Sequence, residues 1–445
     1  MKLEKITILF AFTLIIALIL LTTNCRRENT TPLTHADSLK TEYDVMKRAI
    51  YQVFKTGGGW YRYPYYLWYD KVSTVNLDSF KTPFELLDSL RYKQLDRFSY
   101  LAGKSAQNQL FNEGQYIGIG FGFKADAANL LRVNFVFSDS PLVSEGVQRG
   151  WILKSVNGNT VDATTFTSSA FGKDAAGVTN TIVFEDLLGA DHTVVVAKKV
   201  ITMNTVLEAK VVQTGNKKVG YLAFESFFKP SVSELNTAFT YFKSQQIDEL
   251  VVDLRYNGGG RVDVADSLAS SIAGDIAKGR VFVYFSFNEL YSGSNTQINL
   301  AGSKFSLSLN RVFFITTEGT ASASELMING LKPYMNVYVV GSKTYGKPVG
   351  MSGFEFKDYD WVLMPIIFQS TNANGQGAYY NGIAPDSYVS DDLLHDLGDP
   401  QEACLSSVLS FIQNGTFPPS VKSQSIVRGW NIQQIRGLRS EIGAF

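Results

Sequence analysis

Cysteine and histidine are scarce in this chain of 445 residues, which holds two cysteines and three histidines. A structural zinc site needs four such ligands close together, and His35, His192 and His395 are scattered, so the sequence predicts no metal site. Charge of one sign is also lacking, because 41 basic residues balance 41 acidic ones. We therefore expect no nucleic-acid partner. An apolar content of 45% is that of an ordinary globular protein.

The one long uncharged apolar run covers residues 6–21 and follows Lys2 and Lys5. A basic start with a short apolar run predicts an export signal. Cys25 stands where a lipoprotein signal places its lipidated cysteine, so we expect a protein anchored by lipid in the cell envelope. An uncleaved anchor and an ordinary signal with an incidental cysteine remain the alternatives. With Cys25 lipidated, Cys404 has no intramolecular partner, and stability must come from packing.

The periodicity of apolar residues changes along the chain. Spacing from residue 42 to about 103 is helical and includes W-Y-R-Y-P-Y-Y-L-W-Y at residues 60–69, a cluster that could grip peptide side chains or be buried. We favour burial in a small helical domain. After residue 205, short apolar strands alternate with helical patterns. That alternation predicts an α/β core in which helices cover a sheet, with sites at the strand ends.

Between these regions the pattern is one of short strands and turns. Y-I-G-I-G-F-G-F at residues 116–123 and the S-P-…-N-G-N-T-V stretch at residues 140–161 resemble the peptide-binding loop and turn sequence of bacterial PDZ domains. The resemblance implies that the N–H groups of Gly118, Ile119 and Gly120 bind a carboxylate while the strand edge adds the peptide backbone. A hairpin with glycine turns is the alternative.

A serine-rich stretch at residues 317–331 opens into an apolar segment. Ser322-x-x-Glu325 fits a capping box at a helix start, although a nucleophilic Ser322 would have to leave capping to a neighbour. Upstream, the glycine loop at residues 257–260 lacks the Gly-Lys-Ser/Thr and G-x-G-x-x-G patterns of nucleotide sites, so no nucleotide cofactor is expected. Its amides could stabilise an oxyanion, or the loop could be only a tight turn.

No G-x-S-x-G sequence is present, which disfavours an α/β-hydrolase. A lysine is the other basic partner that a serine can use, and it must be neutral to accept a proton. Only about one lysine in a few thousand is neutral near pH 7 at its ordinary pKa, so such a lysine needs a desolvated site. K-T-Y-G-K-P-V-G at residues 343–350 offers Lys347 just after a predicted strand. A surface lysine in a turn is the alternative.

Together, D-L-R-x-N-x-G-G, A-S-A-S-E and T-Y-G-K resemble the motifs of the carboxyl-terminal processing (tail-specific) serine peptidases. Lys347 lies 25 positions after Ser322, as the general base follows the nucleophile in that family. The resemblance implies that Ser322 is the nucleophile and Lys347 the base, with the amides of Gly259 and Ala323 as oxyanion donors. It extends to G-Y-L-A-F-E-S-F at residues 220–227 and to a late G-I-A-P-D turn.

One departure concerns the lysine. The family commonly carries a glutamine four residues after it, which helps to orient it, and this chain has Met351 there. Methionine makes no useful hydrogen bond. Ser352, Tyr345 and Gln369 are possible replacements.

The sequence therefore predicts a mixed α/β peptidase core with an upstream PDZ-like β domain and a small N-terminal helical domain. The expected function is that of an exported endopeptidase with a Ser/Lys dyad and no cofactor, which cleaves protein substrates near their C-termini. A non-catalytic peptide- or ligand-binding envelope lipoprotein on the same fold is the alternative, and a scaffold that uses the aromatic cluster is a third. The expected segments are a signal at 1–25, a linker at 26–40, the helical domain at 41–108, the PDZ-like domain at 109–204, the core at 205–415 and a tail at 416–445.

Overall fold

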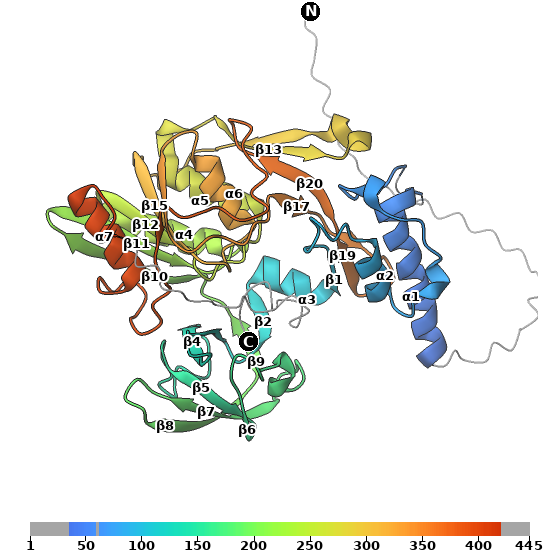
Figure 1. Ribbon diagram of the computed structural model, residues 1–445, viewed down its shortest axis with the longest axis horizontal. Coiled ribbons are helices and arrows are strands. Elements are labelled where there is room, and N and C mark those ends of the chain that lie inside the picture. Colours follow the sequence, from blue (N-terminus) through green and yellow to red (C-terminus); the bar gives the residue numbers. More distant parts are fainter. Residues whose placement is uncertain (1–34, 59–61, 420–445) are drawn as a thin grey trace, which may run out of the picture. The chain divides into compact units, whose positions relative to one another are not determined.

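The computed structural model describes residues 35–58 and 62–419 (Figure 1). The signal and lipid-anchor predictions, Cys25 among them, lie outside these residues. None of the helices in the described part is long and apolar enough to cross a membrane.

The chain divides into two compact units, residues 1–42 and 43–445. The centre of the second unit is a six-stranded sheet in the order β10-β11-β12-β15-β16-β21. The edge strand β10 runs antiparallel to β11, and the other neighbours are parallel. The bounds are β10 Val206–Thr214, β11 Lys217–Phe224, β12 Glu249–Asp253, β15 Arg311–Thr316, β16 Asn336–Gly341 and β21 Ser387–Tyr388.

Helices cover both faces of this sheet, as the alternating strands and helices of the sequence predict. Leu222, Val252 and Phe314 pack on one face against α4 Ser231–Gln245, α5 Val262–Ala273 and α6 Ala323–Leu331. The adjacent residues Val251 and Phe313 point to the other face and pack against α7 Ala403–Asn414. Successive side chains of a strand point to opposite faces, which explains why these strands are apolar throughout. The core is therefore mixed α/β, as predicted.

The predicted N-terminal helical domain is only partly helical. It contains α1 His35–Tyr51 and α2 Pro83–Leu90, but most of the segment between them consists of loops and short turns. Tyr66, from the aromatic cluster, is fully buried. Strand β1 Tyr100–Gly103 then pairs with β19 Trp361–Met364, so the end of this segment completes a sheet with a later part of the chain. Apolar patterning alone did not show this long-range pairing.

A second antiparallel sheet joins that segment to the core. Its order is β14-β13-β20-β17, and β18 completes a three-stranded sheet with β1 and β19. The bounds are β13 Val281–Phe287, β14 Thr296–Asn299, β17 Val349–Met351, β18 Phe354–Glu355 and β20 Ile366–Thr371.

The short helices are η1 Gln52–Thr56, η2 Tyr69–Lys71, η3 Leu77–Ser79, α3 Lys104–Asn108, η4 Gln109–Glu113, η5 Ser168–Phe171, η6 Gly274–Ile276 and η7 Glu289–Ser294.

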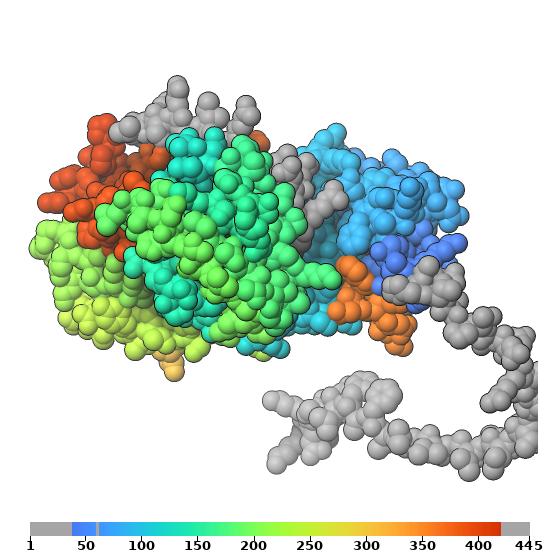
Figure 2. Space-filling model, turned by 90° about the horizontal axis from the view of Figure 1, so that it is seen from below, coloured from blue at the N-terminus to red at the C-terminus, as the bar shows by residue number. Residues whose placement is uncertain are grey.

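The segment with the PDZ-like sequence folds into a sheet with its own apolar core. The strand order is β3-β4-β5-β7-β8, with β6 beside β5, and β2 and β9 form a separate pair. Figure 2 shows the residues of this region in teal and green. The bounds are β2 Gln115–Gly118, β3 Phe121–Ala125, β4 Leu131–Val136, β5 Ile152–Val156, β6 Asn159–Thr160, β7 Thr179–Glu185, β8 Asp191–Ala197 and β9 Lys199–Thr202.

Positive φ angles occur where the sequence predicted turns in this domain. Gly146 and Gly150 have φ of 75° and 89°. Asn157 and Gly158 have φ of 52° and 81°. Glycine and asparagine adopt this left-handed backbone at the least cost, which is why they stand at these positions.

Candidate active site

Ser322 lies at the first turn of α6, where the chain has just left β15. Its backbone has φ +57° and ψ −114°, a strained conformation for a residue with a side chain. Two hydrogen bonds hold the preceding residues against the loop after β12: Thr320 Oγ1 donates to Leu254 O at 2.7 Å, and Ala321 N–H donates to Asn257 O at 3.1 Å. The half-buried Ser322 side chain is thereby fixed beside the glycine loop.

Glu325, which is fully buried, connects the Ser322 stretch to the Lys347 loop. Its Oε2 accepts the N–H of Ser322 at 3.0 Å and the N–H of Lys347 at 2.8 Å. Its Oε1 accepts Thr344 Oγ1 at 2.6 Å and Gly346 N–H at 2.7 Å. One carboxylate oxygen of Glu325 thus bridges the backbone N–H groups of Ser322 and Lys347.

Burial raises the pKa of Glu325, while the hydrogen bonds from Thr344 and the backbone N–H groups act in the opposite direction. The donors are all neutral groups. Ser322 and Glu325 also form the reciprocal arrangement of a capping box, so Ser322 itself caps α6. The expectation that a neighbouring residue takes the capping role was therefore wrong, and Ser322 Oγ has to leave the cap before it can attack a substrate.

The glycine loop contacts Ser322 directly. A Cβ atom on Gly259 would lie 2.8 Å from both Ser322 Cβ and Ala321 O, so only glycine fits there, and φ is +104°. The Gly259 N–H donates to Asn257 Oδ1 at 2.9 Å, so the predicted oxyanion donor already has a partner in this structure. For Ala323 N–H, by contrast, no acceptor is found among residues 62–419. It is the first N–H of α6, which helical geometry leaves without an intrahelical partner.

Ser324, two positions on, is held in a structural role. It is fully buried, and its Oγ donates to Asn257 Oδ1 at 3.0 Å. Asn257 in turn donates from Nδ2 to Phe224 O at 2.9 Å. These bonds fix the loop against the end of β11.

Lys347 is half-buried and reaches toward the N-terminal segment. Its Nζ lies 5.4 Å from the centroid of the Phe98 ring. Within the described part of the chain, Lys347 Nζ and Ser322 Oγ are not joined by a hydrogen bond. The structure therefore brings the two loops together without engaging the two side-chain groups.

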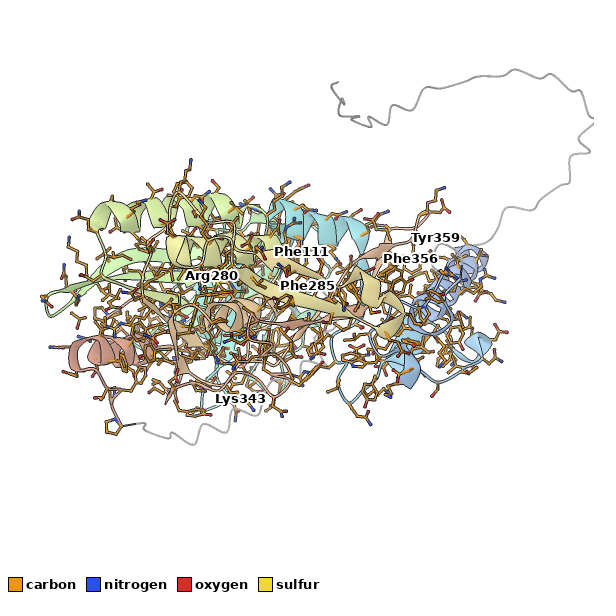
Figure 3. The ribbon with its side chains drawn as sticks, turned by 90° about the horizontal axis from the view of Figure 1, so that it is seen from above. Phe111, Arg280, Phe285, Lys343, Phe356 and Tyr359 are labelled. Carbon is orange, nitrogen blue, oxygen red and sulfur yellow. The ribbon has the colours of Figure 1, made fainter. Side chains whose placement is uncertain are left out.

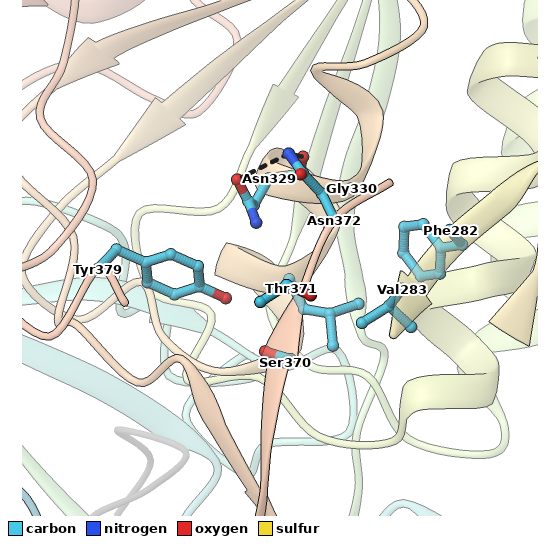
Figure 4. A pocket seen from close by; sticks show the side chains of 9 residues that line it. Phe282, Val283, Asn329, Gly330, Ser370, Thr371, Asn372 and Tyr379 are labelled. Carbon is cyan, nitrogen blue, oxygen red and sulfur yellow. Dashed lines mark hydrogen bonds between the residues drawn. The ribbon is translucent and has the colours of Figure 1, made fainter. Parts of the chain in front are cut away.

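A small indentation, too tight to hold a water molecule, lies between α6 and β20 (Figure 4). Tyr379 faces it. Burial raises the pKa of the Tyr379 phenol, and the negative charge of the nearby Glu325 raises it further. Ser370, also in the lining, donates from Oγ to Pro348 O at 3.1 Å, next to Lys347. The other lining residues are Phe282, Val283, Leu326, Asn329, Gly330, Thr371 and Asn372. The indentation thus borders both the Ser322 helix and the Lys347 loop.

The predicted peptide-binding residues connect two sheets: Gly118 ends β2 and pairs with Lys199 of β9, and Ile119 and Gly120 lead into β3. Ile119 is fully buried, and its carbonyl accepts Ser140 Oγ at 2.7 Å. Gly120 has φ +88°, and a Cβ there would lie 2.9 Å from Ser140 Cβ. Strand β3, which follows directly, is at the edge of its sheet.

Sequence reasoning missed a buried ionic cluster on the other side of the glycine loop. Arg255, which is 1% exposed, donates to Asp253, Asp391 and Glu402. Arg149 joins from the β3–β8 domain, donating to Tyr256 Oη at 2.7 Å. The D-L-R motif contained the signal, since an arginine at the end of a buried strand needs carboxylate partners. Those partners are distant in sequence, so the motif could not identify them.

Charge sets the protonation of this cluster. Burial alone would raise the pKa of Asp391, but the charges of Lys124, Arg255 and Arg149 hold it well below its usual range. In the described residues, no group of histidines, cysteines or carboxylates is arranged to hold a metal ion.

Comparison with known proteins first defines the fold. A crystal structure of a Bacteroides fragilis protein assigned to the S41 proteases superposes with a TM-score of 0.67 and 22% identity, covering 84% of this chain and 97% of that one. Residues 218–389 match the model of peptidase family S41, and residues 63–100 match that of the peptidase S41 N-terminal domain. These two segments of the chain are therefore similar to the peptidase domain and the N-terminal domain of peptidase family S41.

Relatives named "Probable CtpA-like serine protease" are found in staphylococci. The protein of Staphylococcus aureus strain N315 is 25% identical over 342 residues, which cover 71% of this chain and 65% of the relative. That of Staphylococcus epidermidis is 30% identical over 175 residues, or 39% of this chain and 34% of the relative. The chain thus spans about two thirds of the length of the Staphylococcus aureus relative.

Proposed function

We propose that this protein is a serine endopeptidase in which Ser322 is the nucleophile and Lys347 the general base. The observation that carries the proposal is the Glu325 carboxylate, whose Oε2 accepts the backbone N–H of both residues. The close approach of Gly259 to Ser322 supports it, since a glycine loop against a serine leaves room for a substrate carbonyl.

In the proposed reaction, Ser322 Oγ bonds to the carbonyl carbon while its proton moves to Lys347 Nζ. The carbonyl π electrons move to oxygen, and Ala323 N–H is the donor best placed to stabilise that oxyanion. Gly259 N–H becomes the second donor once it leaves Asn257 Oδ1. Lys347 then returns the proton to the leaving amine, and water cleaves the acyl-enzyme. Substrate binding has to bring Lys347 Nζ within hydrogen-bond reach of Ser322, as unliganded sites often require.

We propose further that substrates bind by their C-termini to a PDZ-like domain. The edge position of β3 and the left-handed Gly120 support this, because a peptide strand can add to a free edge while loop amides bind its carboxylate. A peptide with a free C-terminus should bind more tightly than its C-terminal amide. Equal affinity of the two peptides would contradict C-terminal capture.

Export and lipid anchoring at Cys25 are also part of the proposal, and they rest on the sequence of the signal-like segment. In cells fed a labelled fatty acid, the full chain should incorporate the label and Cys25→Ser should not. Equal labelling of both proteins would remove Cys25 as the anchor.

The main test uses an unfolded protein substrate. Ser322→Ala and Lys347→Ala should each lower kcat by about a thousandfold or more, because a nucleophile and its base act as a unit. Lys343, an exposed lysine four residues before Lys347, provides the matched control Lys343→Ala (Figure 3). Undiminished cleavage by Ser322→Ala would remove this residue from the mechanism. Peptide binding with no turnover by the unaltered protein would favour the non-catalytic alternative.

A further inference from the structure

Two residues at the end of the N-terminal S41 segment contact the Lys347 loop. Arg97 donates from Nη2 to the carbonyl of Tyr345 at 2.6 Å, and its guanidinium lies 4.5 Å from the Tyr345 ring centroid. Phe98 packs edge-on to Tyr345 at 5.8 Å and presents its ring to Lys347 Nζ at 5.4 Å. This segment is more than 200 positions away in sequence, so no motif around Lys347 could indicate it.

Phe98 is held rigidly in this position. Its side chain is only 6% exposed, and its N–H donates to Asp96 Oδ1 at 3.0 Å. Asp96 is itself buried and accepts Tyr66 Oη and Ser99 Oγ, both at 2.7 Å. The ring is therefore a fixed wall of the lysine site, anchored by a buried turn.

Because Met351 stands where the family commonly has a glutamine, the Phe98 ring beside Lys347 Nζ is a candidate for orienting the ammonium. Met351 is half-buried in the apolar cluster that contains Phe98, and its thioether is no substitute for an amide. An aromatic face attracts a cation and so fixes its position without a hydrogen bond. The titratable and charged groups on the elements around Lys347 are Asp96, Arg97, Glu325, Tyr345, Tyr379 and Tyr380.

We propose that Phe98 is a positioning residue for Lys347, whose ring stabilises the ammonium that forms when Lys347 takes the Ser322 proton. The inference rests on the proposed function of the pair. In that step the Oγ–H bond breaks, an Nζ–H bond forms, and positive charge appears on Nζ next to the ring. The N-terminal S41 segment thus supplies part of the site that the missing glutamine leaves incomplete.

The experiment compares Phe98→Leu and Phe98→Tyr with Phe356→Leu. Phe356 is a matched control because it is a buried phenylalanine of the same apolar cluster, in the β18–β19 hairpin (Figure 3). Phe98→Leu should lower kcat by about 3- to 30-fold with little change in KM. Phe98→Tyr, which keeps the ring, should restore kcat. Equal losses of kcat in Phe98→Leu and Phe356→Leu would overturn the inference.

A second readout does not depend on turnover. Protons beside an aromatic face resonate upfield, so the lysine side chain assigned by its loss in Lys347→Arg should be shifted in NMR spectra of the unaltered protein. The shift should vanish in Phe98→Leu and persist in Phe356→Leu; an unchanged shift in Phe98→Leu overturns the inference. Failure of an active-site fluorophosphonate to label Ser322 in the unaltered protein would instead overturn the proposed function, and the kinetic role of Phe98 with it.

Discussion

Two buried polar clusters lie beside the glycine loop and are built in opposite ways. In the first, the Glu325 cluster, one carboxylate accepts hydrogen bonds from four neutral groups of Ser322, Thr344, Gly346 and Lys347. In the second, the Arg255 cluster, the cations Lys124, Arg149 and Arg255 meet the carboxylates Asp253, Asp391 and Glu402.

The difference suggests a division of labour. A carboxylate held by neutral backbone donors fixes the positions of the loops that supply those donors, and burial raises the pKa of Glu325. A carboxylate held by cations stays ionised, as the lowered pKa of Asp391 indicates. The Glu325 cluster therefore positions candidate catalytic loops, whereas the Arg255 cluster binds β12 to α7 and to the β3–β8 domain. Changes in the first should act mainly on activity and changes in the second mainly on stability.

The largest effect on activity should come from Glu325→Ala. This change leaves four buried donors without an acceptor and frees the Ser322 and Lys347 loops from each other. We expect kcat to fall by at least about a hundredfold, since a misplacement of about 1 Å can have that effect. Glu325→Gln keeps one carbonyl acceptor and should retain more activity. The check is hydrolysis of an unfolded substrate, and equal activity in both variants would contradict the positioning role.

The second prediction concerns stability. Arg255→Ala leaves Asp253 and Glu402 buried with no counter-charge from the arginine, and such a loss costs about 3–5 kcal/mol. Urea unfolding should show this decrease in the free energy of unfolding. The exposed pair of Arg261 and Asp263 offers a control, because Arg261→Ala should cost about 1 kcal/mol or less. Equal losses in the two variants would show that the buried cluster is not what stabilises the fold.

The sequence predicted the family and the α/β core because both depend on local patterns. Strand β16 Asn336–Gly341 and helix α5 Val262–Ala273 lie where the spacing of apolar residues in the sequence predicts a strand and a helix. The contact between Gly259 and Ser322 required the fold, because it joins loops after two different strands. The pairing of β1 with β19 could not be predicted either, since it joins residues far apart and leaves no mark in either strand's periodicity.

The sequence proposed the candidate site as a set of residues but not as a geometry. The resemblance to the peptidase family pointed to Ser322 and Lys347, and nothing in the sequence showed that Gly259 N–H has an acceptor in Asn257. The same holds for Phe98, which reaches Lys347 from the N-terminal segment. Side-chain contacts between distant segments depend on packing, which single motifs do not encode.

Glu225 is a third buried carboxylate that can be compared with the Glu325 cluster and the Arg255 cluster. It is fully buried, receives Ser226 Oγ at 2.5 Å, and has no cation partner among residues 62–419. Burial raises its pKa to about 8. A raised pKa means that the folded protein holds a proton that the unfolded chain releases, so this contribution to stability is full at acid pH and is lost as pH rises toward 8.

Replacing Glu225 by glutamine should therefore flatten the dependence of stability on pH. Glu225→Gln keeps the shape of the side chain and cannot ionise, so at pH 8 it should be more stable than the unaltered protein by a few kcal/mol. Near pH 4 the two should be alike. Urea unfolding at a series of pH values measures the difference, and parallel curves for the two proteins would show that Glu225 does not titrate in this range.

The smallest expected effect is that of Met351→Gln, which places a glutamine four residues after Lys347. Met351 is half-buried on β17, where it pairs with Ile366. If an amide can orient the lysine, kcat should rise by roughly 2- to 10-fold, which corresponds to about one net hydrogen bond.

The same change should restore more activity in a Phe98→Leu protein, because the ring and the amide would then serve one purpose. Met351→Leu controls for packing and should leave both rates unaltered. A gain that is equal with and without Phe98 would mean that the two groups act independently on Lys347.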